Sequence, residues 1–338
     1  MKVFHANDPT RPVTQALFRP NVSHDYDNGL ADLLDVVGQN YREKEILAAH
    51  AQKPSRKILG TENTHDRNQW VALRDHAPYA GQFLWTGIDY LGEAGEWPNR
   101  ANGAGLLDLC GFKKPLAWFR QSLWSDQPMV YLCATDGTRG NGRRGFYLAE
   151  HWNWPSNSTV TVICYANCPE VALTLNDQII SVKKISEATN GALRWQIPYA
   201  AGPLKAVGRS NGVELCRFAL QTAGPANRIE LLPDATRLRA DGKDICHLEF
   251  RIVDAQGVRV PDAAPEVTLT LNGPARLLGM ENGDLNSPEP YQGPTRKAFH
   301  GRGLAIFQST TAAGKISVTA TATGLEPATI ELETENGN

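Results

Sequence analysis

The sequence predicts a multi-domain protein in which a partial (β/α)8 (TIM) barrel is followed by two all-β sandwiches. Short apolar runs alternate with helical patterns up to about residue 126. Beyond that point, alternating apolar and polar residues, turns rich in Gly and Asn, and β-branched runs replace the helical patterns. A length of 338 residues is sufficient for two or three domains with cores of their own.

The first predicted domain, residues 1–126, contains four apolar runs with the length of buried strands. These runs are Arg11–Leu17, Leu33–Tyr41, Lys57–Glu62 and Gly81–Tyr90. Helical spacing follows at Glu43–Gln52 and Arg67–His76, and an amphipathic helix is predicted at Lys114–Trp124. Strand, helix, strand is the unit of a parallel sheet, and a closed barrel needs eight such strands. The domain therefore accounts for half of a barrel.

The remaining chain is predicted to form two sandwiches, residues 127–222 and residues 223–338. Strand patterns in the first occur at 159–165, 171–175, 192–197 and 204–208. Residues 223–226 form a short linker. Strand patterns in the second occur at 229–232, 246–253, 267–271, 305–309 and 316–322.

Charge and cysteine usage exclude several classes of function. The 34 basic and 36 acidic residues nearly balance, which disfavours a nucleic-acid or membrane-surface partner and favours a neutral ligand. No apolar run approaches the roughly 20 residues that span a bilayer, and the N-terminus lacks the apolar core of a secretory signal. The compartment stays open between the periplasm or cell exterior and the cytoplasm. Six scattered cysteines fit neither a zinc site nor a disulfide framework, so we expect buried thiols and no metal or cofactor.

Glu62 and Trp85 are the two residues that point to chemistry. Glu62 ends one predicted strand and Trp85 lies near the end of the next. In a (β/α)8 barrel the reactive groups lie at the carboxyl ends of the strands. A carboxylate beside an aromatic platform at that position suits a retaining glycosidase, as nucleophile and as stacking face for a sugar. A salt-bridge partner and a core tryptophan are the competing interpretations.

Four strings carry a family resemblance in the same order along the chain. They are KILGTE (57–62), GQFLWTGIDYLGE (81–93), GLLDLCGF (105–112) and KPLAWFRQSLW (114–124). Together they resemble the last part of the catalytic barrel of glycoside hydrolase family 2, and of its β-galactosidase branch most of all. The resemblance implies that the four strands are the fifth to eighth of the barrel, and that both sandwiches are immunoglobulin-like domains.

The resemblance implies a retaining mechanism in which Glu62 matches the nucleophile and Tyr41 matches a tyrosine that orients it. The general acid/base of the family is the Glu of an Asn-Glu pair after the fourth strand, and this sequence contains no Asn-Glu pair. Residues 8–12 resemble the segment just after that strand. We therefore expect a C-terminal portion of an enzyme, inactive alone, whose partner is the N-terminal half or another copy of the chain.

Five further residues are candidates for contact with a carbohydrate substrate. They are Asn40, His65, Asp89, Glu93 and Trp97. Each is equally consistent with a hydrogen-bonded loop residue, or with a packing anchor in the case of Trp97.

Two motifs in the sandwiches are assigned structural roles. Trp152, in HWNWP (151–155), is expected in a sandwich core rather than at a sugar site. ENGD (281–284) is expected to form a turn, because one short acidic loop supplies too few ligands for calcium.

Two alternative functions stay open. The first is a non-catalytic carbohydrate-binding or interaction module made by the sandwiches. The second is a β-glucuronidase-type enzyme, which would need basic residues at the barrel mouth.

Overall fold

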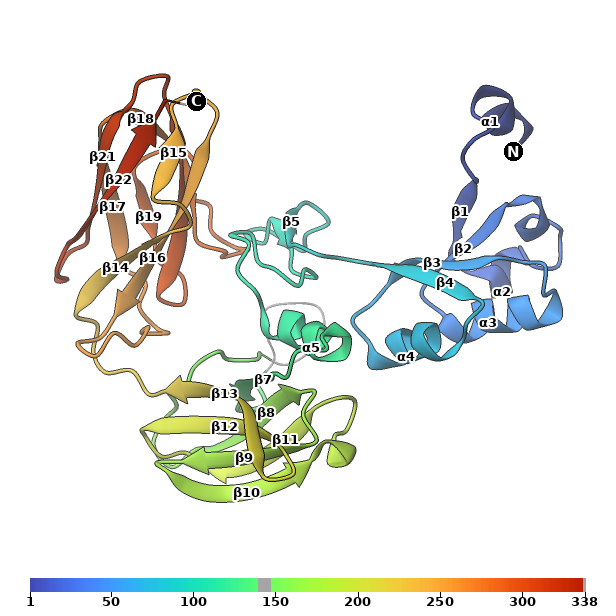
Figure 1. Cartoon of the computed structure of the whole chain (residues 1–338), viewed down its shortest axis with the longest axis horizontal. Coiled ribbons are helices and arrows are strands. Elements are labelled where there is room, and N and C mark those ends of the chain that lie inside the picture. Colours follow the sequence, from blue (N-terminus) through green and yellow to red (C-terminus); the bar gives the residue numbers. More distant parts are fainter. Residues whose placement is uncertain (139–146, 337–338) are drawn as a thin grey trace. The chain divides into compact units, whose positions relative to one another are not determined.

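The computed structural model describes residues 1–138 and 147–336 and divides into two compact units, Met1–Gly87 and Ile88–Asn338 (Figure 1). The division lies inside the region predicted as barrel, so residues 88–126 group with the sandwiches. The predicted domain boundaries after residues 126 and 222 stay predictions. No helix in the described part of the chain is long and apolar enough to cross a membrane.

The first unit is built on a parallel sheet of four strands in the order β1-β2-β3-β4. Its strands are β1 (Thr14–Leu17), β2 (Val36–Asn40), β3 (Ile58–Asn63) and β4 (Tyr79–Leu84), and its main helices are α3 (Glu43–Gln52) and α4 (Arg67–Asp75). The shorter elements are α1 (Lys2–Asn7), α2 (Pro20–Ser23) and a 3-10 turn, η1 (Ala31–Leu33). These elements confirm the two predicted helices and the first three strands. The fourth strand was predicted as a buried run over Gly81–Tyr90, but it spans Tyr79–Leu84, is mostly not buried and ends just before Trp85. The membership of these strands and helices in a (β/α)8 barrel stays a prediction.

Apolar side chains from strands and helices form the core of the first unit. Val37 of β2, Ile46 of α3 and Ile58 of β3 are each at most 1% exposed. Gly38 of β2 lies directly against the side chain of Thr61 in β3. A Cβ atom on Gly38 would lie only 2.4 Å from Cγ2 of Thr61. A larger residue at Gly38 would therefore push β2 and β3 apart just before their carboxyl ends.

The second unit begins with a loop-rich segment that contains the strand pair β5 (Tyr90–Leu91) and β6 (Ala101–Asn102). Helix α5 (Pro115–Trp124) follows, as the amphipathic pattern predicts. Its N-cap residue is Lys114, and Pro115 occupies the first turn, where no backbone donor is needed.

Sandwich 1, which comprises β7 to β13, packs a four-stranded sheet (β10-β9-β12-β13) against a three-stranded sheet (β11-β8-β7). The strands are β7 (Val130–Thr135), β8 (Thr159–Ala166), β9 (Glu170–Leu175), β10 (Gln178–Lys184), β11 (Leu193–Pro198), β12 (Pro203–Ser210) and β13 (Val213–Gln221), with a 3-10 turn, η2 (Ile185–Glu187). Trp152 is fully buried in the core of this sandwich, which confirms the structural role expected for it.

Sandwich 2, which comprises β14 to β22, packs the sheet β14-β16-β20-β18 against the sheet β15-β22-β21-β17-β19. The strands are β14 (Arg228–Pro233), β15 (Arg237–Arg239), β16 (Ile245–Val253), β17 (Glu266–Asn272), β18 (Ala275–Glu281), β19 (Thr295–Lys297), β20 (Arg302–Ser309), β21 (Gly314–Thr321) and β22 (Ala328–Glu335). Its core includes Phe250 and Phe307 from neighbouring strands. All six cysteines are free thiols; five are buried, and Cys216 is partly exposed.

Candidate active site

Glu62 and Tyr41 lie together at the carboxyl end of the parallel sheet in the first unit. Glu62 is the penultimate residue of β3, and Tyr41 directly follows β2. The phenolic hydroxyl of Tyr41 donates a hydrogen bond to Oε1 of Glu62. The backbone N–H of Tyr41 also donates to the carbonyl oxygen of Glu62, at 2.6 Å. Two contacts therefore fix the position of a half-buried carboxylate relative to its neighbour.

Tyr41 and Arg42 both adopt left-handed backbone conformations, with φ angles of 58° and 54°. Residues other than Gly are uncommon in this region, and bulky residues there carry strain. Strain of this kind persists only where the surroundings hold it, and it clusters at functional sites. The turn after β2 thus directs the Tyr41 hydroxyl toward Glu62 instead of continuing the strand.

Asn40 and Trp85 lie at the ends of the strands on either side of β3. Asn40 is paired with Glu62 in the sheet register, and its Oδ1 accepts a hydrogen bond of 2.9 Å from the Thr61 hydroxyl. Trp85 directly follows β4, and its backbone N–H donates to the carbonyl oxygen of Asn63, at 2.9 Å. The ends of β2, β3 and β4 therefore present Asn40, Glu62 and Trp85 side by side.

His65 lies in the loop between β3 and α4, and this loop is tied to the helix. The buried side chain of Gln69 accepts a 2.6 Å hydrogen bond from the backbone N–H of Thr64. The loop is thereby held against the first turn of α4, and His65 lies two residues after the end of β3.

Buried polar side chains beneath this strand end were not predicted from the sequence. Gln39 is fully buried and accepts a hydrogen bond from the Tyr26 hydroxyl. Asn63, also fully buried, donates to the Tyr79 hydroxyl at 3.2 Å and to Oε1 of Gln82 at 3.0 Å. The signal available in the sequence was an amide residue inside an otherwise apolar strand, a placement that requires hydrogen-bond partners.

Asp89, Glu93 and Trp97 belong to the second unit. Asp89 is buried, and its Oδ1 accepts hydrogen bonds from the backbone N–H of Gly105 (2.8 Å) and from Nζ of Lys114 (2.7 Å). These bonds give Asp89 a structural role, whatever else it contacts. Glu93 accepts a hydrogen bond from the Tyr90 hydroxyl, and Trp97 has 73% of its surface exposed.

Two domain families match parts of the second unit. The glycoside hydrolase family 2 C-terminal domain 5 matches residues 229–331. A domain of unknown function (DUF4982) matches residues 157–216. The first match covers most of sandwich 2 and the second covers the middle of sandwich 1.

Individual relatives extend the likeness to almost the whole chain. The β-galactosidase BoGH2A of Bacteroides ovatus is 30% identical over an alignment that includes 97% of this chain. A β-glucuronidase of Formosa agariphila is 24% identical over 65% of this chain. The crystal structure of a glycosyl hydrolase family 2 member from Bacteroides cellulosilyticus superposes with a TM-score of 0.90 at 29% identity, over 97% of this chain.

These relatives are longer than the present sequence. The chain spans 42% of the Bacteroides ovatus protein and 45% of the Bacteroides cellulosilyticus chain. The likeness therefore concerns slightly less than half of each of these two proteins, and 21% of the Formosa agariphila protein.

Proposed function

This chain belongs to glycoside hydrolase family 2, and on that basis we propose that it contributes the nucleophile half of a retaining β-glycosidase site. Glu62 is the nucleophile and Tyr41 orients it. The observation that carries the proposal is the double contact between these two residues at the carboxyl end of a parallel sheet.

The environment of Glu62 suits a nucleophile more than a structural carboxylate. Acidic residues are disfavoured in strands, so an acidic residue at a strand end suggests a functional role. None of the ion pairs among the described residues involves Glu62. The hydroxyl of Tyr41, a neutral phenol, donates a hydrogen bond to its carboxylate, which stabilises the anion.

The proposed reaction proceeds in two steps. An oxygen of Glu62 attacks the anomeric carbon of a terminal β-linked sugar, and the bond from that carbon to the leaving oxygen breaks as a general acid protonates the leaving oxygen. Water then attacks the glycosyl ester, its proton passes to the same acid/base residue, and Glu62 is released with overall retention. In such pairs the two carboxyl groups lie about 5–5.5 Å apart.

The general acid is proposed to come from the segment of the longer relatives that this chain does not span. The sequence has no Asn-Glu pair, which is the pattern that the family resemblance associates with the acid/base. We use the term assembled enzyme for this chain together with a polypeptide that supplies that segment. The chain alone is expected to turn over natural substrates poorly, because the leaving group then departs without a proton.

A terminal galactose is the proposed sugar, since the relative that aligns with 97% of the chain is named a β-galactosidase. A glucuronide is the second candidate, because another relative is named a β-glucuronidase. Trp85 is proposed as the stacking face for the sugar ring, with Asn40 and His65 as hydrogen-bonding partners for its hydroxyl groups. Parallel assays of aryl β-galactoside and aryl β-glucuronide with the assembled enzyme distinguish the two sugars.

Covalent trapping tests the proposed nucleophile directly. The assembled enzyme is incubated with 2,4-dinitrophenyl 2-deoxy-2-fluoro-β-galactoside, whose leaving group departs without acid assistance, and the digested protein is examined by mass spectrometry. We expect the fluorosugar on the peptide that contains Glu62, and no label in the Glu62→Gln variant. A label on another carboxylate would refute the assignment of Glu62. Saccharide binding without any label would favour the non-catalytic module instead.

A further inference from the structure

An exposed tryptophan, Trp97, is presented by a hydrogen-bonded hairpin in the second unit. The hairpin, residues 90–102, is closed by the β5–β6 pairing and by a 3.0 Å hydrogen bond from the N–H of Gly92 to the carbonyl oxygen of Arg100. A 3.0 Å bond from the N–H of Asn99 to the carbonyl of Glu96 closes the tip around Trp97. A large aromatic side chain on a rigid support loses little entropy on binding.

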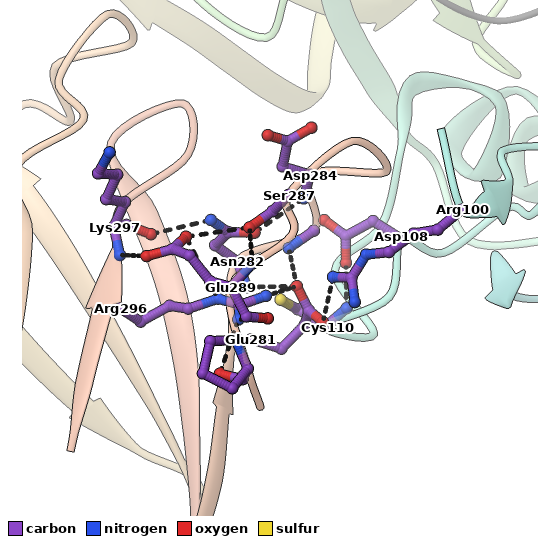
Figure 2. Close-up of polar contacts among 12 residues, drawn as sticks. Arg100, Asp108, Cys110, Glu281, Asn282, Asp284, Ser287, Glu289, Arg296 and Lys297 are labelled. Carbon is purple, nitrogen blue, oxygen red and sulfur yellow. Dashed lines mark hydrogen bonds and ion pairs between the residues drawn. The ribbon is translucent and has the colours of Figure 1, made fainter. Parts of the chain in front are cut away.

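The base of this hairpin is bound to sandwich 2 through Arg100. The backbone N–H of Arg100 donates to the carbonyl oxygen of Leu285, at 3.0 Å. Its guanidinium lies over the ring of Tyr291, 4.8 Å from the ring centroid, and its Nη2 is 3.7 Å from Oε2 of Glu281. Figure 2 shows Arg100 and Glu281 in this cluster of polar contacts. One arginine thus connects the hairpin to three residues of sandwich 2.

The two surfaces approach so closely that small residues are needed at the contact. A Cβ atom on Gly103 would lie 2.8 Å from Cδ1 of Leu285. On the other side, a Cβ atom on Gly283 would lie 3.1 Å from Oδ2 of Asp108, a residue of the segment that follows the hairpin. The hairpin segment and sandwich 2 are therefore closely packed against each other at this contact.

Glu281 is held so that only one of its oxygens faces Arg100. Its Oε1 accepts hydrogen bonds from the N–H groups of Asn282 (2.8 Å) and Gly283 (3.1 Å) and from Nη2 of Arg296 (2.8 Å). Arg296 is fully buried and Glu281 is 8% exposed. Oε2 faces Nη2 of Arg100, and Glu281 also lies beside Tyr291, the residue on which Arg100 stacks.

We propose that Glu281 and Arg100 are positioning residues that make sandwich 2 the support of the Trp97 hairpin, and that Trp97 binds the apolar face of a neutral saccharide. The substrate class rests on the proposed glycosidase function. The coupling between Glu281 of sandwich 2 and the Trp97 hairpin does not depend on that function. Removing the Glu281 charge would leave Arg100 desolvated without its anion, which favours local opening of the hairpin. Trp97 would then be mobile and would bind more weakly.

The coupling is tested on the full chain with Glu281→Gln, which keeps an oxygen acceptor for its backbone donors. Glu249→Gln is the matched control, because Glu249 has 14% of its side chain exposed and is paired with Arg251 at 2.7 Å on another strand of sandwich 2. We expect amide hydrogen exchange at residues 92–102 to accelerate by at least about tenfold in Glu281→Gln and to stay unchanged in Glu249→Gln. Unchanged exchange in the hairpin of a folded Glu281→Gln variant would overturn the proposal.

If Glu281→Gln does not fold, Arg100→Lys replaces it. This variant keeps the positive charge and the backbone bond to Leu285 but loses the planar group that stacks on Tyr291. We expect faster exchange in the same hairpin residues, and unchanged exchange there again overturns the proposal.

The saccharide-binding role of Trp97 is tested with lactose as the probe, and binding is measured by isothermal titration calorimetry. The assembled enzyme carries Glu62→Gln in these measurements to prevent turnover. We expect Trp97→Ala and Glu281→Gln each to weaken binding by about three- to tenfold. The double variant should bind no more weakly than Trp97→Ala alone, because both changes act through one side chain. Additive losses would overturn the coupling of Glu281 to Trp97, and no loss in Trp97→Ala would overturn the saccharide role of Trp97. Fluorosugar labelling of Glu62 in the otherwise unaltered assembled enzyme would still support the proposed function in that case.

Discussion

The hydroxyl of Tyr41 and the carboxylate of Glu62 are hydrogen-bonded, although 21 residues and a whole helix separate them in the chain. The bond exists because parallel strands place successive carboxyl ends at one edge of the sheet. The left-handed turn at Tyr41 completes it by directing the ring sideways. The arrangement holds one carboxylate in a defined orientation, which is the requirement for in-line attack on an anomeric carbon.

Replacing Tyr41 by Phe should impair chemistry and leave the fold intact. A hydrogen bond to a charged group contributes about 1.5–3 kcal/mol, so kcat/KM of the assembled enzyme should fall by roughly 10- to 150-fold. Tyr26→Phe is the matched control, because Tyr26 also donates its hydroxyl to a neighbouring side chain, that of Gln39. It should lower the melting temperature without a comparable loss of kcat/KM. Equal kinetic effects of the two substitutions would contradict the role of Tyr41.

Replacing Trp85 by Ala tests the proposed sugar platform. Stacking contributes on the order of 1 kcal/mol beyond the area buried, so KM should rise and kcat should fall in the assembled enzyme. Trp85→Phe keeps an aromatic face and should recover most of the loss. Wild-type kinetics together with a lowered melting temperature would make Trp85 a packing residue only.

Strand and helix positions near the candidate nucleophile followed from the sequence because local patterns determine them. β2 and β3 are apolar runs that alternate with helices, and Glu62 lies within one residue of its expected place at a strand end. Several sandwich strands were missed, β10 and β13 among them. Both strands lie at the edges of their sheet, and most of their residues are exposed. Because exposed edge strands need few apolar residues, they lack the alternating pattern by which strands are predicted.

Contacts that join distant segments were beyond local patterns. Asp89 was expected at a barrel mouth as a substrate contact, and the structure gives it bonds to Gly105 and Lys114 in the following loop. Glu281 was read only as part of a turn, although its main partners are Arg296 and Arg100. Such pairs depend on which loops the fold brings together, and no spacing rule along the chain encodes them.

The two units should differ in independent stability. Residues 88–338 contain the complete cores of both sandwiches, so this fragment should be soluble and should unfold cooperatively in calorimetry. Residues 1–87 form a four-stranded parallel sheet with open edges at β1 and β4, and parallel sheets are normally covered on both faces. That fragment alone should be oligomeric or loosely ordered. A monomeric fragment 1–87 with a sharp thermal transition would contradict this expectation.

His151 should make the second unit lose stability as the pH falls. Burial lowers the pKa of His151 from 6.5 to about 4, and its Nδ1 accepts a hydrogen bond from the N–H of Asn153, which requires a neutral ring. Between about pH 6.5 and pH 4, His151 is therefore protonated in the unfolded chain and neutral in the folded chain. At most about 3 kcal/mol of stability is lost over this range as the pH decreases.

The substitution His151→Asn isolates this contribution. Asparagine offers an acceptor to the same backbone N–H and does not titrate. Urea unfolding of residues 88–338 at several pH values should show a shallower decline below pH 6.5 in the variant than in the wild type. Identical pH dependence of the two free energies of unfolding would show that His151 does not titrate on unfolding in this range.

Chemical rescue distinguishes a nucleophile from every other role for Glu62. Glu62→Ala removes the carboxylate and leaves a space, whereas Glu62→Gln removes the charge and fills the same volume. Both variants should lose almost all turnover of an aryl β-galactoside by the assembled enzyme. Added azide should restore turnover in Glu62→Ala only, because the small anion occupies the vacated position and attacks the anomeric carbon from the face that Glu62 uses.

The configuration of the rescued product supplies the decisive measurement. A single displacement by azide inverts the anomeric carbon, so a β-galactoside should give α-galactosyl azide, identified by its anomeric coupling constant in NMR. A general acid/base residue would behave differently, since azide attack on its glycosyl-enzyme intermediate gives the β-azide after two displacements. A β-azide product would therefore reassign Glu62 to acid/base catalysis, and full activity of Glu62→Gln without azide would remove it from the reaction altogether.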